Sequence, residues 1–162
     1  MSNQICHQNL LAVSIQGELI AEGVRLCVSR KERKKGVLGI TNLQPSQGAL
    51  LDLRGRPPLR FLFGIHTVGV PFNLAAAWVG ADSCIIDRFL AVPGRFYLPP
   101  RVPAYVLELH ASHFEKLVPG ADVTWTLSGV GGWKEDQPYR SPNEEPGRTI
   151  TGTNVPDGSD GR

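Results

Sequence analysis

Short apolar segments separated by glycine and proline are the feature that most restricts how this chain can fold. The 162 residues include 18 glycines and 13 prolines, and the apolar runs between them are short. Runs of about four to eight residues that are rich in Val, Ile, Leu and Phe are typical of β-strands. We therefore predict strands at residues 10–15, 23–28, 49–53, 60–65, 74–79, 83–90, 105–109 and 122–127.

Two segments interrupt this pattern, and each begins with a Ser-x-x-Glu motif, at residues 29–32 and 112–115. In such a capping box the serine and glutamate side chains each accept a hydrogen bond from a backbone N–H at the start of a helix. We predict two short helices here. The first extends to about Val37 and the second to about Leu117, before Pro119 and Gly120.

The composition changes after Ser128, where a glycine-rich stretch is followed by prolines, acidic residues and serines with almost no aliphatic side chains. Such a segment buries too little apolar surface to offset the entropy lost on ordering. We predict a single mostly β domain over residues 1–130, with a compact, barrel-like sheet of antiparallel or mixed strands and two short helices. Residues 131–162 are predicted to form a disordered C-terminal tail.

Charge, cysteines and missing signatures limit the classes of function. The net charge of +2 does not predict a nucleic-acid partner, and three cysteines without a Cys-x-x-Cys pair argue against a disulfide framework or a four-thiolate zinc site. The chain shows no basic leader and no transmembrane segment, which predicts a cytoplasmic protein. It also shows no phosphate-binding loop, dinucleotide turn or nucleophile elbow, so we expect no cofactor and favour binding over catalysis.

Six pieces of the sequence occur in an order found in a known family: Lys-Gly-Val-Leu-Gly (35–39), Gln-Gly-Ala-Leu-Leu (47–51), Ile-His-Thr-Val-Gly (65–69), Phe-Asn-Leu (72–74), Pro-Gly-Arg (93–95) and Ala-Tyr-Val-Leu-Glu-Leu (104–109). Over residues 23–127 the chain resembles the bacterial and archaeal domain of unknown function 192 family, as a divergent member. The resemblance implies a compact, mostly β, barrel-like domain with small helices and an unassigned role. Family members carry an aspartate where a gapless comparison places Ala75, and Asn73 is the nearest polar residue.

Five residues are candidates for binding a ligand: His66, Thr67, Asn73, Arg95 and Glu108. Histidine side chains titrate near neutral pH, so His66 is suited to ligand contact or proton transfer. The alternative, which we favour, is a buried imidazole that bonds a backbone carbonyl. We interpret Glu108 as an ion-pair partner of an arginine such as Arg95 rather than as a catalytic acid.

Two further clusters are assigned to the surface. His110 and His113 lack the additional ligands that a metal site needs. The basic stretch Arg-Lys-Glu-Arg-Lys-Lys at residues 30–35 is able to attract phosphates, but we favour a solvated helix face, because no aromatic side chain for base stacking lies nearby.

The sequence leads to two hypotheses about function. The first is a non-enzymatic binding or accessory module with a protein or small-molecule partner. The second is an enzyme or binder that acts on a small anionic ligand, with His66 at the polar centre of the site and Arg95 or Arg88 holding the anion. Convergence of His66, Asn73, Arg95 and Glu108 in one pocket would favour the second.

Overall fold

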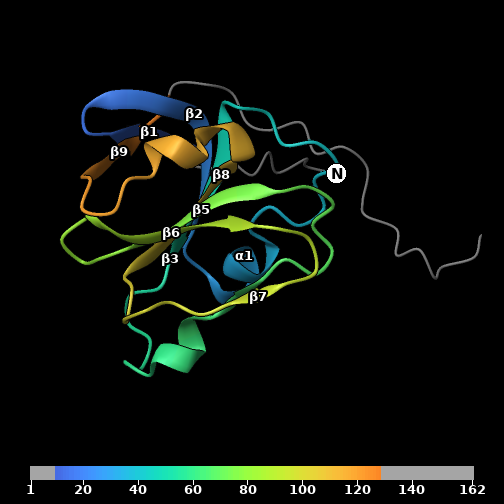
Figure 1. The fold of residues 1–162 in the computed structure, drawn as a ribbon, viewed down its shortest axis with the longest axis vertical. Helices are drawn as coiled ribbons and strands as arrows, with labels where there is room; N and C mark the ends of the chain where they lie inside the picture. The colour runs from blue at the N-terminus through green and yellow to red at the C-terminus, as the bar shows by residue number, and fades with distance from the viewer. Residues whose placement is uncertain (1–9, 129–162) are drawn as a thin grey trace, which may run out of the picture.

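The computed structural model describes residues 10–128, which form nine strands, one α-helix and two 3-10 helices (Figure 1). The elements are β1 (Leu10–Ile15), β2 (Glu18–Cys27), α1 (Arg30–Lys35), β3 (Gln47–Asp52), η1 (Arg60–Phe63), β4 (Ile65–His66), β5 (Leu74–Val79), β6 (Ile85–Ala91), β7 (Phe96–Tyr97), β8 (Tyr105–His110), η2 (Ala111–Lys116) and β9 (Val123–Leu127). The predicted tail lies outside the described residues. Within residues 10–128, no helix has both the length and the apolar character needed to cross a membrane.

Seven strands form one mixed sheet in the order β6-β5-β8-β3-β2-β1-β9. The pair β2–β3 is parallel and has α1 in its connection, whereas the other neighbours in this sheet are antiparallel. Strands β4 and β7 form a separate antiparallel pair. The predicted mostly β, mixed architecture is therefore correct. An isolated bridge between Cys84 and Asp122 links the two edges of the large sheet at one point, but the sheet is not closed, and a barrel is not confirmed.

Both faces of the large sheet are covered, which explains why successive residues of its central strands are buried on both sides. All six residues of β5 are buried, as are the first five of β8. One face packs a core that includes Val13, Leu50 and Leu107. The opposite face packs a second core with Trp78, Phe63 and residues that follow α1. Figure 1 shows α1 between the large sheet and the β4–β7 pair. Helix α1 and this strand pair therefore cover the second face of the large sheet.

The first predicted helix is confirmed. Ser29 caps α1 by accepting a hydrogen bond from the Glu32 backbone N–H, and the Glu32 carboxylate accepts one from the Ser29 backbone N–H. The second prediction was wrong in its cap and helix type. Segment η2 is a 3-10 helix that begins at Ala111, and His110 Nδ1, not Ser112, is the capping acceptor.

The strand predicted at residues 60–65 was also wrong. The structure has the 3-10 helix η1 there, and only Ile65 and His66 are extended, as β4. A short apolar run between glycine and proline does not distinguish a buried strand from one helical turn. The helix places Phe63 in the second core and leaves the next residues to pair with β7.

Candidate ligand-binding site

A row of side chains crosses the second face of the large sheet and places Glu108 between two alanines. Glu108 on β8 lies opposite Ala49 on β3 and Ala76 on β5. Arg25 on β2 pairs with Ala49, and Phe89 on β6 pairs with Ala76, so all five share one face. Because alanine side chains end at Cβ, the space above the sheet on both sides of Glu108 is left for other groups.

The carboxyl group of Glu108 is buried and only partly hydrogen-bonded. The residue is 8% exposed, and its side chain accepts a bond from the Val37 backbone N–H. Oε2 has no hydrogen-bond partner in the described part of the chain. Burial raises the pKa of Glu108 to about 7, and the bond from Val37 acts in the opposite direction. This carboxyl group therefore changes charge near neutral pH.

The end of α1 lies directly against this carboxyl group. Gly36, the C-cap, has φ of +43°, and a Cβ at this position would lie 3.0 Å from Glu108 Oε2. The Gly36 carbonyl accepts a 3.4 Å hydrogen bond from Arg25 Nη1. The sheet and the helix end are thus joined around Glu108, and glycine is the residue that permits both the backbone angle and the close approach.

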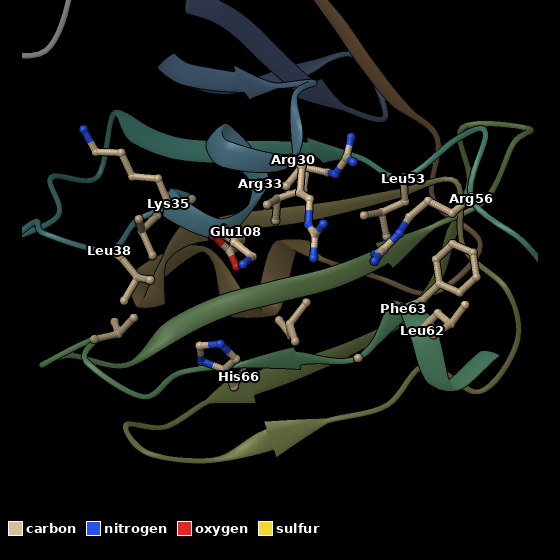
Figure 2. A pocket seen from close by; sticks show the side chains of 17 residues that line it. Arg30, Arg33, Lys35, Leu38, Leu53, Arg56, Leu62, Phe63, His66 and Glu108 are labelled. Carbon is tan, nitrogen blue, oxygen red and sulfur yellow. The ribbon is translucent and has the colours of Figure 1, made fainter. Parts of the chain in front are cut away.

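A cavity of about 370 Å³ opens beside Glu108, between α1 and the segment that contains η1 and β4. Figure 2 shows Glu108 and His66 pointing toward this space from β8 and β4, with Arg33 and Arg56 extending toward it from other sides. The Lys35 ammonium group points outward. The apolar lining is Val37, Leu38, Leu51, Leu53, Leu62, Phe63, Ile65 and Val70, and the basic lining is Arg30, Arg33, Lys34, Lys35 and Arg56.

Two arginines that line the cavity are held in place by contacts with backbone carbonyls or with an aromatic ring. Arg33 Nη1 donates to the backbone carbonyls of Val28 and Asp52, the latter at 3.1 Å. The Arg56 guanidinium lies over the Phe63 ring, 5.6 Å from its centroid. Both cations are therefore oriented by the fold before any ligand arrives, which reduces the entropy cost of binding.

His66 lies at the open side of the cavity. His66 lines the cavity, and its side chain is exposed and forms no hydrogen bond within residues 10–128. The favoured interpretation, a buried imidazole bonded to a backbone carbonyl, was therefore wrong. The two-residue strand β4 ends at His66, so the imidazole stands at the rim rather than inside the β4–β7 pair.

The remaining candidates do not join His66 and Glu108. Thr67 is buried, and its hydroxyl donates to the Val92 carbonyl and accepts a 2.9 Å bond from the Arg95 backbone N–H. Asn73 and Arg95 are exposed and do not line the cavity. The predicted Arg95–Glu108 ion pair is not formed, since Glu108 Oε2 is unpartnered. The structure thus brings together two of the five residues.

The sequence interpretation missed the basic helix as part of the site. Arg30, Arg33 and Lys34 are spaced at i, i+3 and i+4, so they share one side of α1, and all three line the cavity, whereas Lys31 does not. This spacing is visible in the sequence. The missing information was that the helix packs over a buried carboxyl group from a strand more than seventy residues later in the chain.

The histidine pair near η2 is separate from this site. The His113 imidazole forms a 2.7 Å hydrogen bond with the Pro45 carbonyl, and His110 Nδ1 lies 2.8 Å from Ser112 Oγ. No group of three or more His, Cys, Asp or Glu side chains able to hold a metal is found among the described residues.

Comparison with known proteins gives similarity of fold alone. No family model matches the chain, and no curated protein matches it. A crystal structure of a "putative transcription regulator" from Sinorhizobium meliloti is similar with a TM-score of 0.63 and 21% identity, over 76% of this chain and 98% of that one. A protein of unknown function from Novosphingobium aromaticivorans has a TM-score of 0.64 and 18% identity, over 77% of this chain and 91% of that one. At these identities, the chain is similar to both in fold.

Proposed function

We propose that this domain is a non-enzymatic binding module for a small anionic ligand, held in the cavity between α1 and β4 with His66 at its rim. The observation that carries the proposal is the joint lining of one cavity by basic and apolar side chains. Arginine and lysine groups that gather around a hollow raise the local concentration of anions. Apolar walls of leucine, valine and phenylalanine bind the hydrocarbon part of a ligand.

The two arginines oriented by the fold have the geometry that anionic groups require. A guanidinium group offers parallel N–H donors to a carboxylate or phosphate, and such charge-assisted bonds are stronger than neutral ones. Arg33 on α1 and Arg56 before η1 both extend toward the cavity (Figure 2), and Lys34, which also lines it, adds a point charge. The cavity volume is near the lower end of the range for small-molecule sites, which favours a compact ligand.

Two lysines of α1 provide a matched test. Lys34 lines the cavity, whereas Lys31 lies on the same helix and does not. Titration of the isotope-labelled full chain with hexanoate, followed by NMR, should give saturable shifts at Gly36, Val37 and His66. Lys34→Gln should weaken this binding and its salt dependence, and Lys31→Gln should leave both unchanged. Equal effects of the two substitutions would show that hexanoate responds only to net charge and would reject the site.

The alternative is an enzyme that acts on a small anionic ligand. One observation favours it: Glu108, whose pKa is raised to about 7, shares a cavity with His66, and such groups serve as acids and bases. The residues that line the cavity include no serine, threonine or cysteine, so the lining offers no hydroxyl or thiol nucleophile. The binding module is the simpler proposal, because it accounts for the basic and apolar lining without assuming a reaction.

We also propose that the chain is a distant relative of the bacterial and archaeal domain of unknown function 192 family, because the six sequence pieces occur in the order found in that family. We further propose that it acts in the cytoplasm. The first proposal would gain support from homologues that bridge the two sequences with these pieces in register. Fractionation of the source cells tests the second.

A further inference from the structure

An acceptor without a donor lies at the inner end of the cavity. Glu108 is more than nine-tenths buried, it lines the cavity, and its Oε2 has no hydrogen-bond partner in the described part of the chain. Leaving a buried carboxyl oxygen unbonded costs free energy, and the cost is larger when the group is ionised. A donor that entered the cavity and reached Oε2 would recover this cost.

The protein's own cations do not supply that donor. Arg33 directs Nη1 to the Val28 and Asp52 carbonyls, and Arg56 is placed over Phe63. The side chains next to Glu108 on the sheet are Ala49 and Ala76, which have no polar atoms. The raised pKa of Glu108 agrees with this arrangement, because a cation at close range would lower it.

We propose that the ligand is a small anion that carries an N–H or O–H donor at the end opposite its anionic group, and that this donor bonds Glu108 Oε2. The inference rests on the proposed function, because the basic rim is what orients the anionic end outward. The cavity then meets three parts of one molecule: the anionic group at the basic lining and His66, an apolar body along the aliphatic lining, and the donor at Glu108.

Three probes of equal chain length test the donor. Hexanoate has no donor at its far end, 6-hydroxyhexanoate has a hydroxyl group there, and 6-aminohexanoate has an ammonium group. We expect the hydroxy and amino compounds to bind the full chain about tenfold more tightly than hexanoate, since a hydrogen bond to a charged group is worth about that factor or more. The measurement is the same NMR titration, with shifts followed at Gly36, Val37 and His66.

Two substitutions at Glu108 make the test specific. Glu108→Leu removes the acceptor and keeps an apolar side chain of similar size, so the hydroxy and amino compounds should lose their advantage over hexanoate. Glu108→Gln keeps an acceptor and removes the charge, so the hydroxy compound should retain part of its advantage while the amino compound loses most of it. The second variant decides the question if the first does not fold.

The pH dependence adds a second readout. An ammonium group bonds an ionised carboxylate, so the advantage of 6-aminohexanoate over hexanoate should grow from about pH 5.5 to about pH 8 in the natural protein. It should not change with pH in Glu108→Leu, which would assign the pH dependence to Glu108. The charged and titratable side chains that face Glu108 or its cavity from the surrounding elements are Arg25, Cys27, Arg30, Arg33, Lys34, Lys35, Arg56 and His66.

The outcomes distinguish this inference from the function on which it rests. If hexanoate binds as tightly as both donor compounds, or if their advantage survives in Glu108→Leu, the donor inference is rejected and the anion-binding function stands. If none of the three probes produces saturable shifts at millimolar concentration, both are rejected. Tighter binding of the donor compounds that depends on Glu108 supports both.

Discussion

Gly36 and Glu108 approach so closely that a Cβ on Gly36 would lie 3.0 Å from Glu108 Oε2. The contact joins the C-terminal cap of α1 to the eighth strand of the fold, and it lies at the inner end of the candidate site. Any side chain at position 36 would displace either the helix end or the carboxyl group.

Gly36→Ala should therefore destabilise the domain by about 1 to 3 kcal/mol, because alanine is strained at positive φ and its Cβ crowds the carboxyl group. Gly39→Ala is the matched control: Gly39 also has positive φ, of +85°, but a Cβ there meets nothing within 4 Å. Urea unfolding of both variants gives the comparison. An equal loss in the two variants would mean that only the backbone angle matters at Gly36.

The raised pKa of Glu108 predicts a pH-dependent stability. Between the ordinary glutamate pKa of 4.5 and the folded value of about 7, the native state holds a proton that the unfolded state has lost. The contribution of Glu108 to stability is thus fully present below about pH 4.5 and is lost as the pH rises through about 7. The loss amounts to about 3 kcal/mol.

Glu108→Gln removes this titration while keeping the shape of the side chain. The variant should gain stability relative to the natural protein as the pH rises from about 4.5 to 8, measured by urea unfolding. Glu32 and Asp52 have lowered pKa values and contribute in the opposite direction, through hydrogen bonds to Ser29 and Arg54, but they are present in both proteins. A difference in unfolding free energy that does not change with pH would contradict the buried, unpaired state of Glu108.

Patterns that depend on neighbouring residues in the chain predicted the fold well. Strand β5 has the predicted bounds, and the Ser29–Glu32 capping box forms as expected. The errors came where the choice depends on tertiary contacts. Segment 60–63 is helical, with Leu62 and Phe63 in the second core just before the β4–β7 pair, and nothing in its apolar composition indicates this.

The site was only half predictable for the same reason. His66 and Glu108 were selected from the sequence. The exposure of the His66 side chain and the missing partner of Glu108 Oε2, however, depend on pairing between strands that are distant in the sequence. The pairing of Glu108 with Ala49 and Ala76 sets the space around the carboxyl group, and this register cannot be obtained from one strand alone.

His66 and Thr67 are adjacent in sequence and should respond oppositely to substitution. The His66 side chain is exposed and forms no hydrogen bond within residues 10–128, so His66→Ala should change the unfolding free energy by less than about 0.5 kcal/mol. Thr67→Val leaves the Val92 carbonyl and the Arg95 N–H without their partner and should cost about 1 to 3 kcal/mol. A large loss in His66→Ala would restore the structural role that the sequence suggested.

The basic helix should likewise divide into structural and solvated residues. Arg33 donates to the Val28 and Asp52 carbonyls and is only partly exposed, whereas Lys31 is exposed on the same helix. Arg33→Gln should therefore destabilise the domain by about 1 kcal/mol, since the shorter amide cannot keep both bonds, and Lys31→Gln should have an effect within about 0.5 kcal/mol. Thermal unfolding at low and high salt checks the cause: a loss from backbone hydrogen bonds persists at high salt, whereas a loss from surface charge is screened. If both variants lose the same stability and recover it in salt, α1 acts only as a charged surface, and Arg33 is not part of the scaffold that holds the cavity.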